Sequence, residues 1–153
     1  MKLTHKRVIM VLFLLLLGAT PEVALAQEPK APCRLQVGYA HISTHEIKFH
    51  NRRVVKVNAF SICHLPQSNV TINVELWKIG SLGPTKVYKT KIFFPGITDA
   101  GKKLSNEQTF KVCKNSTPTK YFGVASSKAY IAGKWQFARD TFSKKPMLIS
   151  CGT

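Results

Sequence analysis

Polar and apolar residues alternate along most of the chain after residue 33. In the clearest stretch four apolar residues occupy every second position, namely Val70, Ile72, Val74 and Leu76. A period of two places successive side chains on opposite faces of a β-strand. We therefore predict a strand at 70–77 with one buried face and one wetter face.

The same reasoning predicts further short strands, separated by Pro and Gly residues that are typical of turns. No segment has the apolar stripe of a convincing amphipathic helix, and 96–107 is predicted to be a loop. Short strands at spacings of roughly 10 to 15 residues indicate an all-β fold, a single antiparallel β-sandwich of immunoglobulin-like type. The additional strands are predicted at 34–41, 54–63, 87–94, 108–113, 120–126, 134–139 and 147–151.

The first 26 residues have the features of a signal peptide. A basic start is followed by an apolar run at 8–17, which is shorter than the roughly 20 residues that a membrane-spanning helix needs. Ala24 and Ala26 supply the small residues of a cleavage site. We predict a signal peptide at 1–26, a flexible leader at 27–33 and a β-sandwich domain at 34–153, in a secreted, extracellular protein without a transmembrane anchor.

All four cysteines lie in the exported part, so we expect two disulfides. Their spacings contain no C-x-x-C, which argues against a zinc ribbon or a redox centre. Of the three connectivities we favour Cys33 with Cys63 and Cys113 with Cys151. The main alternative joins Cys63 to Cys113 and Cys33 to Cys151.

Positive charge dominates the composition. The chain has 23 Lys and Arg against 7 Asp and Glu, a net charge of +16, and cleavage after Ala26 would leave +14. Such a field attracts anionic partners, although lysines also keep small β-proteins soluble. We expect an anionic envelope polymer, a polysaccharide or an extracellular protein as partner, with nucleic acid allowed by charge alone. The candidate anion-binding residues are Arg52, Arg53, Lys56, Lys89, Lys91, Lys102 and Lys103.

Three histidines lie close together in sequence, at 41, 45 and 50. On one strand His41 and His45 would stand about 13 Å apart, too far to share a metal ion. His45 and Glu46 begin like the H-E-x-x-H zinc motif, but position 49 is Phe. We therefore predict a polar loop here and no metal or other cofactor, with His41 and His45 as the candidates considered.

Aromatic residues are interleaved with the basic ones. In a small sandwich most rings are expected in the core, and only Trp77 falls on the polar face of its predicted strand. Exposed rings would allow a sugar or a base to stack. The interleaved rings are Tyr88, Phe93, Phe94, Tyr121, Phe122, Tyr130, Trp135 and Phe137.

Catalytic motifs do not stand out. The chain has neither G-x-S-x-G nor a glycine-rich phosphate loop, and its acids are scattered. Two disulfides would leave no thiol to act as a nucleophile. We therefore expect a protein that is not an enzyme.

One resemblance covers most of the exported part. It rests on H-I-S-T-H at 41–45, V-K-V at 55–57, V-E-L-W at 74–77 and Y-F-G-V-A at 121–125, together with the four cysteines. This order is similar to a group of small secreted four-cysteine β-proteins that is common in actinobacteria. The resemblance implies export, two disulfides and a β fold, and it implies no activity.

The sequence therefore favours a secreted, basic, disulfide-stabilised binding module that is not an enzyme and acts at an anionic cell envelope or on an extracellular partner. The alternative is a secreted antagonist, toxin or inhibitor, because a small, disulfide-bonded protein also suits that role. A hydrolase comes third.

Overall fold

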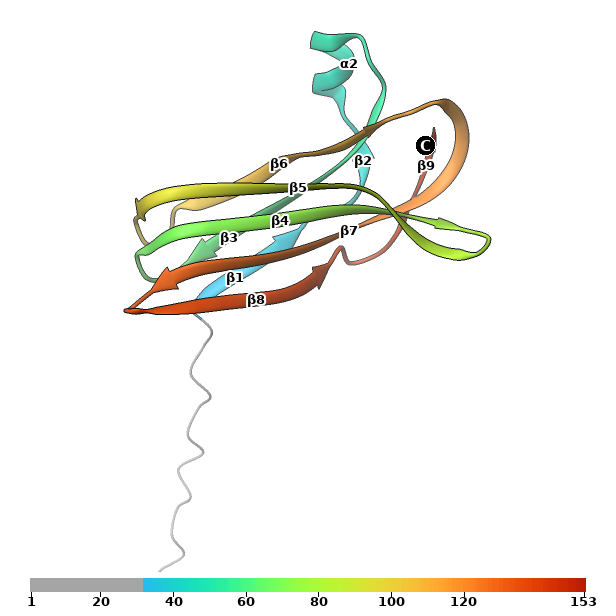
Figure 1. The fold of residues 1–153 in the computed structure, drawn as a ribbon. Helices are drawn as coiled ribbons and strands as arrows, with labels where there is room; N and C mark the ends of the chain where they lie inside the picture. The colour runs from blue at the N-terminus through green and yellow to red at the C-terminus, as the bar shows by residue number, and fades with distance from the viewer. Residues whose placement is uncertain (1–31) are drawn as a thin grey trace, which may run out of the picture. The chain divides into compact units, whose positions relative to one another are not determined.

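The structure, a computed structural model, describes residues 32–153. These residues form two antiparallel β-sheets that face each other (Figure 1). In sheet A, β3 lies in the centre, with β6 along one edge and β1 and β2 one after the other along the opposite edge. Its strands are β1 (Cys33–Val37), β2 (His41–Ile42), β3 (Val54–Cys63) and β6 (Lys103–Val112).

Sheet B follows the order β5, β4, β7, and the far edge of β7 pairs with β9 in its first part and with β8 in its second part. The predicted all-β, immunoglobulin-like sandwich of antiparallel sheets is confirmed. The strands of sheet B are β4 (Gln67–Gly80), β5 (Gly83–Thr98), β7 (Asn115–Ile131), β8 (Lys134–Phe142) and β9 (Met147–Gly152).

The core lies between the inward faces of the central strands. Every second residue of β4 from Val70 to Leu76 is fully buried, as the alternation predicts. Val55, Val57 and Ala59 of β3 face them from sheet A and are also fully buried. Burying a valine-sized or leucine-sized side chain contributes about 1.5–3 kcal/mol, so these two strands supply a large part of the stability.

At Gly123 of β7 the two sheets approach each other closely. A Cβ atom at this position would overlap Cγ2 of Val57 and lie 2.8 Å from Cγ1 of Val37. Because both valines belong to sheet A, any side chain at position 123 would push the layers apart. Glycine is therefore required here by space rather than by backbone conformation.

A buried polar group also connects the sheets. Asn106 of β6 has no exposed surface, and its Nδ2 donates to the carbonyl of Ile72 in β4 at 3.1 Å. Its Oδ1 accepts from the hydroxyl of Thr90 in β5 at 3.1 Å and from the N–H of Gln108 at 3.2 Å. Because a buried amide is costly unless it is bonded, these contacts fix how sheet A sits on sheet B.

The two disulfides confirm the favoured pairing, and the alternative pairing is wrong. Cys33 and Cys63 lie opposite each other on β1 and β3, so their bond stays within sheet A. Cys113 directly follows β6 and bonds to Cys151 of β9, so the second disulfide ties sheet A to sheet B.

Two predicted boundaries differ from the structure, and others fall on residues that it does not describe. The predicted signal peptide at 1–26 and the predicted leader up to residue 31 lie outside the described residues. The prediction that the leader includes Cys33 is wrong, because Cys33 is already part of β1 and faces its disulfide partner. The loop at 96–107 is also wrong, because β5 and β6 stay paired with their neighbours and leave only 99–102 as a turn.

Residues 44–50 form a helix, α2 (Thr44–His50), in place of the predicted polar loop. Sequence reasoning missed it because an amphipathic stripe was required, and this helix hardly touches the core. Figure 1 shows α2 standing clear of the two sheets. In the described part of the chain, no helix has the length and apolar character needed to cross a membrane.

Replacing Gly123 with Ala is expected to lower the free energy of unfolding by about 1–3 kcal/mol, because the new methyl group overpacks the contact between the sheets. Urea denaturation measures this. The control is Gly80→Ala, whose Cβ would meet only the carbonyl of Gly83 at 3.8 Å. Equal effects of the two substitutions would contradict the close approach at Gly123.

The unfolded, unreduced protein is expected to show no reactive thiol in a titration. Replacing Cys113 and Cys151 with Ser should lower the free energy of unfolding by about 3–4 kcal/mol, since the disulfide closes a loop of 38 residues. A melting temperature within a degree or two of the wild-type value would show that this disulfide contributes little.

Candidate functional site

The structure divides the predicted anion-binding residues between two surfaces. Lys89 and Lys91 lie on the outward face of β5 in sheet B. On the side of sheet A, Lys56 is on β3 and Lys103 begins β6. The remaining residues occupy connections: Arg52 and Arg53 follow α2, and Lys102 is in the turn before β6.

On sheet A, the basic side chains lie over aromatic rings. Nζ of Lys103 is 4.2 Å from the ring centroid of Phe60, and the guanidinium of Arg52 is 5.0 Å from that of Phe110. Such cation–π contacts hold the charges in place and cover the rings. This surface therefore has little free aromatic area.

On sheet B, aromatic rings form a row across the strands. Trp77 of β4 lies 6.1 Å from Phe122 of β7, with ring planes 18° apart. Phe122 in turn lies 6.5 Å from Phe142 of β8, with planes 27° apart. Nζ of Lys86 on β5 lies 5.5 Å from the Trp77 ring. Figure 1 shows β5, β4, β7 and β8 side by side, so the row runs across the whole sheet.

A second aromatic group lies farther along β8. Trp135 packs edge to face against Tyr130 at 5.6 Å, and Nζ of Lys128 lies 5.0 Å from the Trp135 ring. Phe137, opposite Lys128 in the register, is 70% exposed. We call both groups with their lysines the aromatic–lysine face, which consists of Trp77, Phe122, Tyr130, Trp135, Phe137, Phe142, Lys86, Lys89, Lys91 and Lys128.

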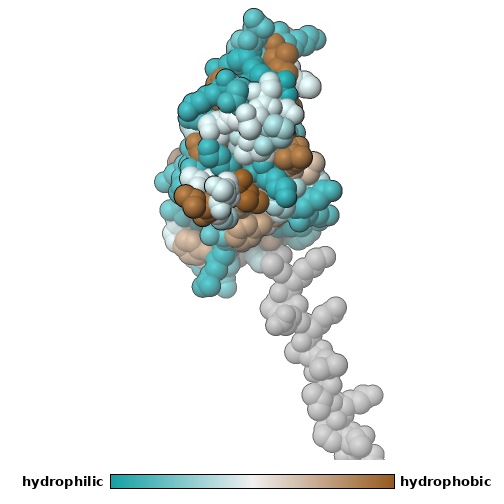
Figure 2. Space-filling model, turned by 90° about the vertical axis from the view of Figure 1, so that its right-hand side faces the viewer, coloured by the Kyte–Doolittle hydropathy of each residue, from teal (hydrophilic) through white to brown (hydrophobic). Residues whose placement is uncertain are grey.

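The expectation that most of these rings lie in the core is wrong. Tyr121 is fully buried, but five of the eight interleaved rings are 40–70% exposed, namely Tyr88, Phe93, Tyr130, Trp135 and Phe137. For Trp135 and Phe137 strand alternation explains the difference, because β8 is an edge strand and turns these two positions away from the inward-facing Ala138. Figure 2 shows the side with the β4–β5 hairpin, where small hydrophobic areas lie between hydrophilic ones.

Glu75 organises the lysines of this face. Its Oε1 accepts from Lys86 at 3.1 Å and lies 3.3 Å from Nζ of Lys89, and its Oε2 accepts from the indole of Trp77 at 3.0 Å. Burial raises the pKa of Glu75, but the hydrogen bonds from Lys86, Trp77 and Lys89 outweigh it and hold the pKa below its ordinary value. Glu75 therefore stays ionised and keeps Trp77 and the lysines in position.

Beside the row of rings lies a small polar hollow on the same sheet. Asn73 and Glu75 of β4, Ser126 of β7 and Asp140 of β8 line it, with a volume of about 20 Å³. The scattered acids of the sequence thus include two, Glu75 and Asp140, that share one hollow. The group offers hydrogen-bond donors and acceptors next to apolar rings.

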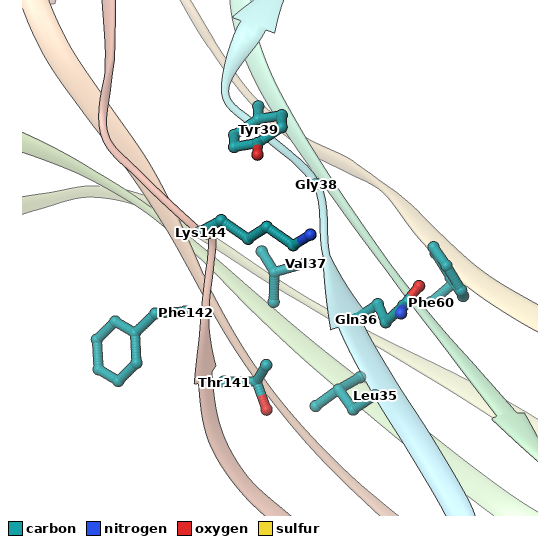
Figure 3. Close-up of a pocket in the computed structure, with 9 residues that line it drawn as sticks. All are labelled: Leu35, Gln36, Val37, Gly38, Tyr39, Phe60, Thr141, Phe142 and Lys144. Carbon is teal, nitrogen blue, oxygen red and sulfur yellow. The ribbon is translucent and has the colours of Figure 1, made fainter.

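A larger hollow of about 400 Å³ lies between β1 and the connection from β8 to β9. Leu35, Val37 and Phe60 supply apolar walls. Figure 3 shows Lys144 extending toward Val37 and Gly38, while the ring of Phe142 points away. Sequence reasoning missed this hollow, because its walls come from opposite ends of the described chain.

The fold separates His41 from the other two histidines. His41 is on β2, and its Nδ1 lies 3.0 Å from the carbonyl of Tyr39. His45 and His50 are on α2, and with Glu46 they bring their potential metal-binding atoms within 4.8 Å of one another. The pair considered from the sequence, His41 and His45, is therefore not the pair that the structure brings together.

A comparison with models of known protein families finds no match, and a comparison with curated proteins finds no significantly similar sequence.

Replacing Glu75 with Gln is expected to lower the free energy of unfolding by about 0.5–1 kcal/mol at pH 7. Because the pKa of Glu75 is lowered by folding, its ionised form stabilises the protein above the pKa of the unfolded chain. This stabilisation is lost as the pH falls through the folded-state pKa. Urea denaturation should therefore show the stabilities of wild type and variant converging as the pH falls below the ordinary pKa range of a carboxyl group. Glu107→Gln, at an exposed position of β6, is the control, and a constant gap for Glu75→Gln would contradict the assignment.

Proposed function

We propose that this chain is a secreted, non-enzymatic binding module that holds an anionic polysaccharide of the cell envelope on its aromatic–lysine face. The observation that carries the proposal is the row of Lys86, Trp77, Phe122 and Phe142 across sheet B. Two disulfides suit a protein of an oxidising extracellular compartment.

The aromatic part of the face suits sugar rings. Aromatic side chains bury a large apolar area and keep a defined geometry, so they bind the apolar C–H faces of sugars at low entropic cost. Phe142, Trp135 and Phe137 on this face keep 45–70% of their surface exposed. Exposed aromatic groups of this kind mark interaction surfaces.

The charged part of the face suits an anionic polymer rather than a neutral one. Lys86, Lys89, Lys91 and Lys128 flank the rings, and the whole chain carries a large positive excess. Such a field raises the local concentration of an anionic polymer and speeds its association. Glu75 neutralises only part of this charge, because two lysines share one carboxylate.

The shape of the face also favours a polymer. The rings and lysines lie on the outside of a sheet, and the hollow beside them is too small for a sugar ring. Its Asn73 and Ser126 side chains are placed to bond hydroxyl groups of a chain that runs across the strands. A small substrate would instead need an enclosing pocket that buries most of its surface.

The test measures binding to dextran sulfate, with uncharged dextran and single-stranded DNA as comparison polymers. Two double variants probe the face: Trp135→Ala with Phe137→Ala, and Lys91→Gln with Lys128→Gln. Each should weaken binding to dextran sulfate at least tenfold at 0.1 M salt, because stacking area or local charge is lost.

The controls match each change elsewhere on the surface. Ile47→Ala with Phe49→Ala removes a similar exposed apolar area on α2, and Lys102→Gln with Lys103→Gln removes two charges away from sheet B. Both controls should change binding less than threefold. Equal losses in test and control variants would mean a diffuse charge and refute the proposal. Tighter binding to DNA than to dextran sulfate at equal charge would favour nucleic acid instead.

A further inference from the structure

The helix α2 brings together two imidazoles and a carboxylate. One nitrogen each from His45 and His50 and one carboxylate oxygen from Glu46 lie within 4.8 Å of one another. In a tetrahedral zinc site with ligands about 2.1 Å from the metal, the ligand atoms are about 3.4 Å apart. Closing the difference requires movements of about 1 Å, which exposed histidine side chains achieve by rotating about χ1 and χ2.

The backbone beneath these side chains is held at both ends. The side chain of Ser43 accepts from the N–H of Glu46 at the start of α2, and Asn51 adopts a left-handed conformation at its end, with a φ of 48°. The N–H of Ser43 donates to the carbonyl of Val54 at 3.1 Å, so the two ends of the segment are tied together. Capping at both ends and the hydrogen bond between the ends of the segment therefore hold the short helix in a defined position.

Glu46 is the fixed member of the cluster. It is buried, and its Oε2 accepts from Nε of Arg52 at 2.5 Å. The contact orients the carboxylate and engages one of its two oxygens. Hydrogen bonds of this kind commonly orient metal ligands from behind.

Packing does not explain the orientation of α2. Glu46 is its buried residue, whereas Ile47 and Phe49 are 46% and 63% exposed. A helix placed for stability would bury its apolar residues and expose its acid. His45 also lies against Phe49, with ring centroids 4.7 Å apart, which limits the positions of its imidazole.

We propose that His45, Glu46 and His50 bind a divalent transition-metal ion of the zinc class. Two neutral imidazoles and one carboxylate form a donor set that zinc uses in proteins, and hard cations such as Mg²⁺ prefer oxygen ligands alone. Three protein ligands leave one position for water or for a donor from a partner molecule. The site is separate from the aromatic–lysine face and independent of its function.

The experiment titrates ZnCl₂ into the mature protein, without a histidine tag, at pH 7.5 in a calorimeter. We expect one zinc per chain and no heat from MgCl₂. His45→Gln with His50→Gln should weaken zinc binding at least tenfold. The matched control, His41→Gln with His64→Gln, removes two exposed histidines outside the cluster and should leave the affinity unchanged within twofold.

A second measurement uses the wild-type protein alone. Zinc should shift the NMR ring signals of His45 and His50 and leave those of His64 in place, and it should raise the melting temperature in proportion to the occupancy. Absence of binding by the wild type at 1 mM zinc would overturn the proposal. So would binding that survives in the His45 and His50 variant or disappears in the control.

Discussion

Strand alternation in β3 and β4 is the constraint on which the rest of the structure depends. Once Val57 and Ile72 face inward, every other residue of these strands is assigned to one face. A shift of one residue would reverse both faces. Asn106 opposes such a shift, because its buried amide must hydrogen-bond to the carbonyl of Ile72. Gly123 also opposes it, because the Val57 side chain needs a residue without a Cβ atom opposite it.

The aromatic–lysine face is a consequence of that constraint. Glu75 and Trp77 occupy the outward positions of the strand whose inward positions fill the core. Antiparallel pairing then sets Lys86 and Phe122 beside Trp77, and Lys89 beside Glu75. The strand pairing alone therefore holds the residues of the proposed docking surface in place. The same strand pairing that forms the core sets the positions of its residues, and such preorganisation lowers the entropic cost of binding a polymer.

The segment that carries α2 follows a different principle. It leaves sheet A after β2 and returns at β3, and its position depends on local hydrogen bonds rather than on apolar burial. The N–H of Cys113 also donates to the carbonyl of Arg53 at 3.0 Å, which anchors the returning end beside the second disulfide. A helix held in this way presents its side chains to solvent, where the proposed metal site would be accessible.

The sequence by itself determined the strands, because the alternation of polar and apolar residues is a local property that is visible in neighbouring residues. The strand predicted at 54–63 has the bounds of β3, and the sandwich followed from such patterns. The even number of cysteines indicated two disulfides, but the tertiary structure decided between the favoured pairing and the alternative. Only the tertiary structure decided which rings are exposed. From the sequence alone Trp135 and Phe137 are expected in the core. The structure places them on β8 at the edge of its sheet, where both rings are exposed. It also decided that His45 meets His50, since capping by Ser43 and Asn51 turns a polar stretch into a helix. Pairing and capping depend on distant or non-repeating contacts, and a periodic pattern contains no information about them.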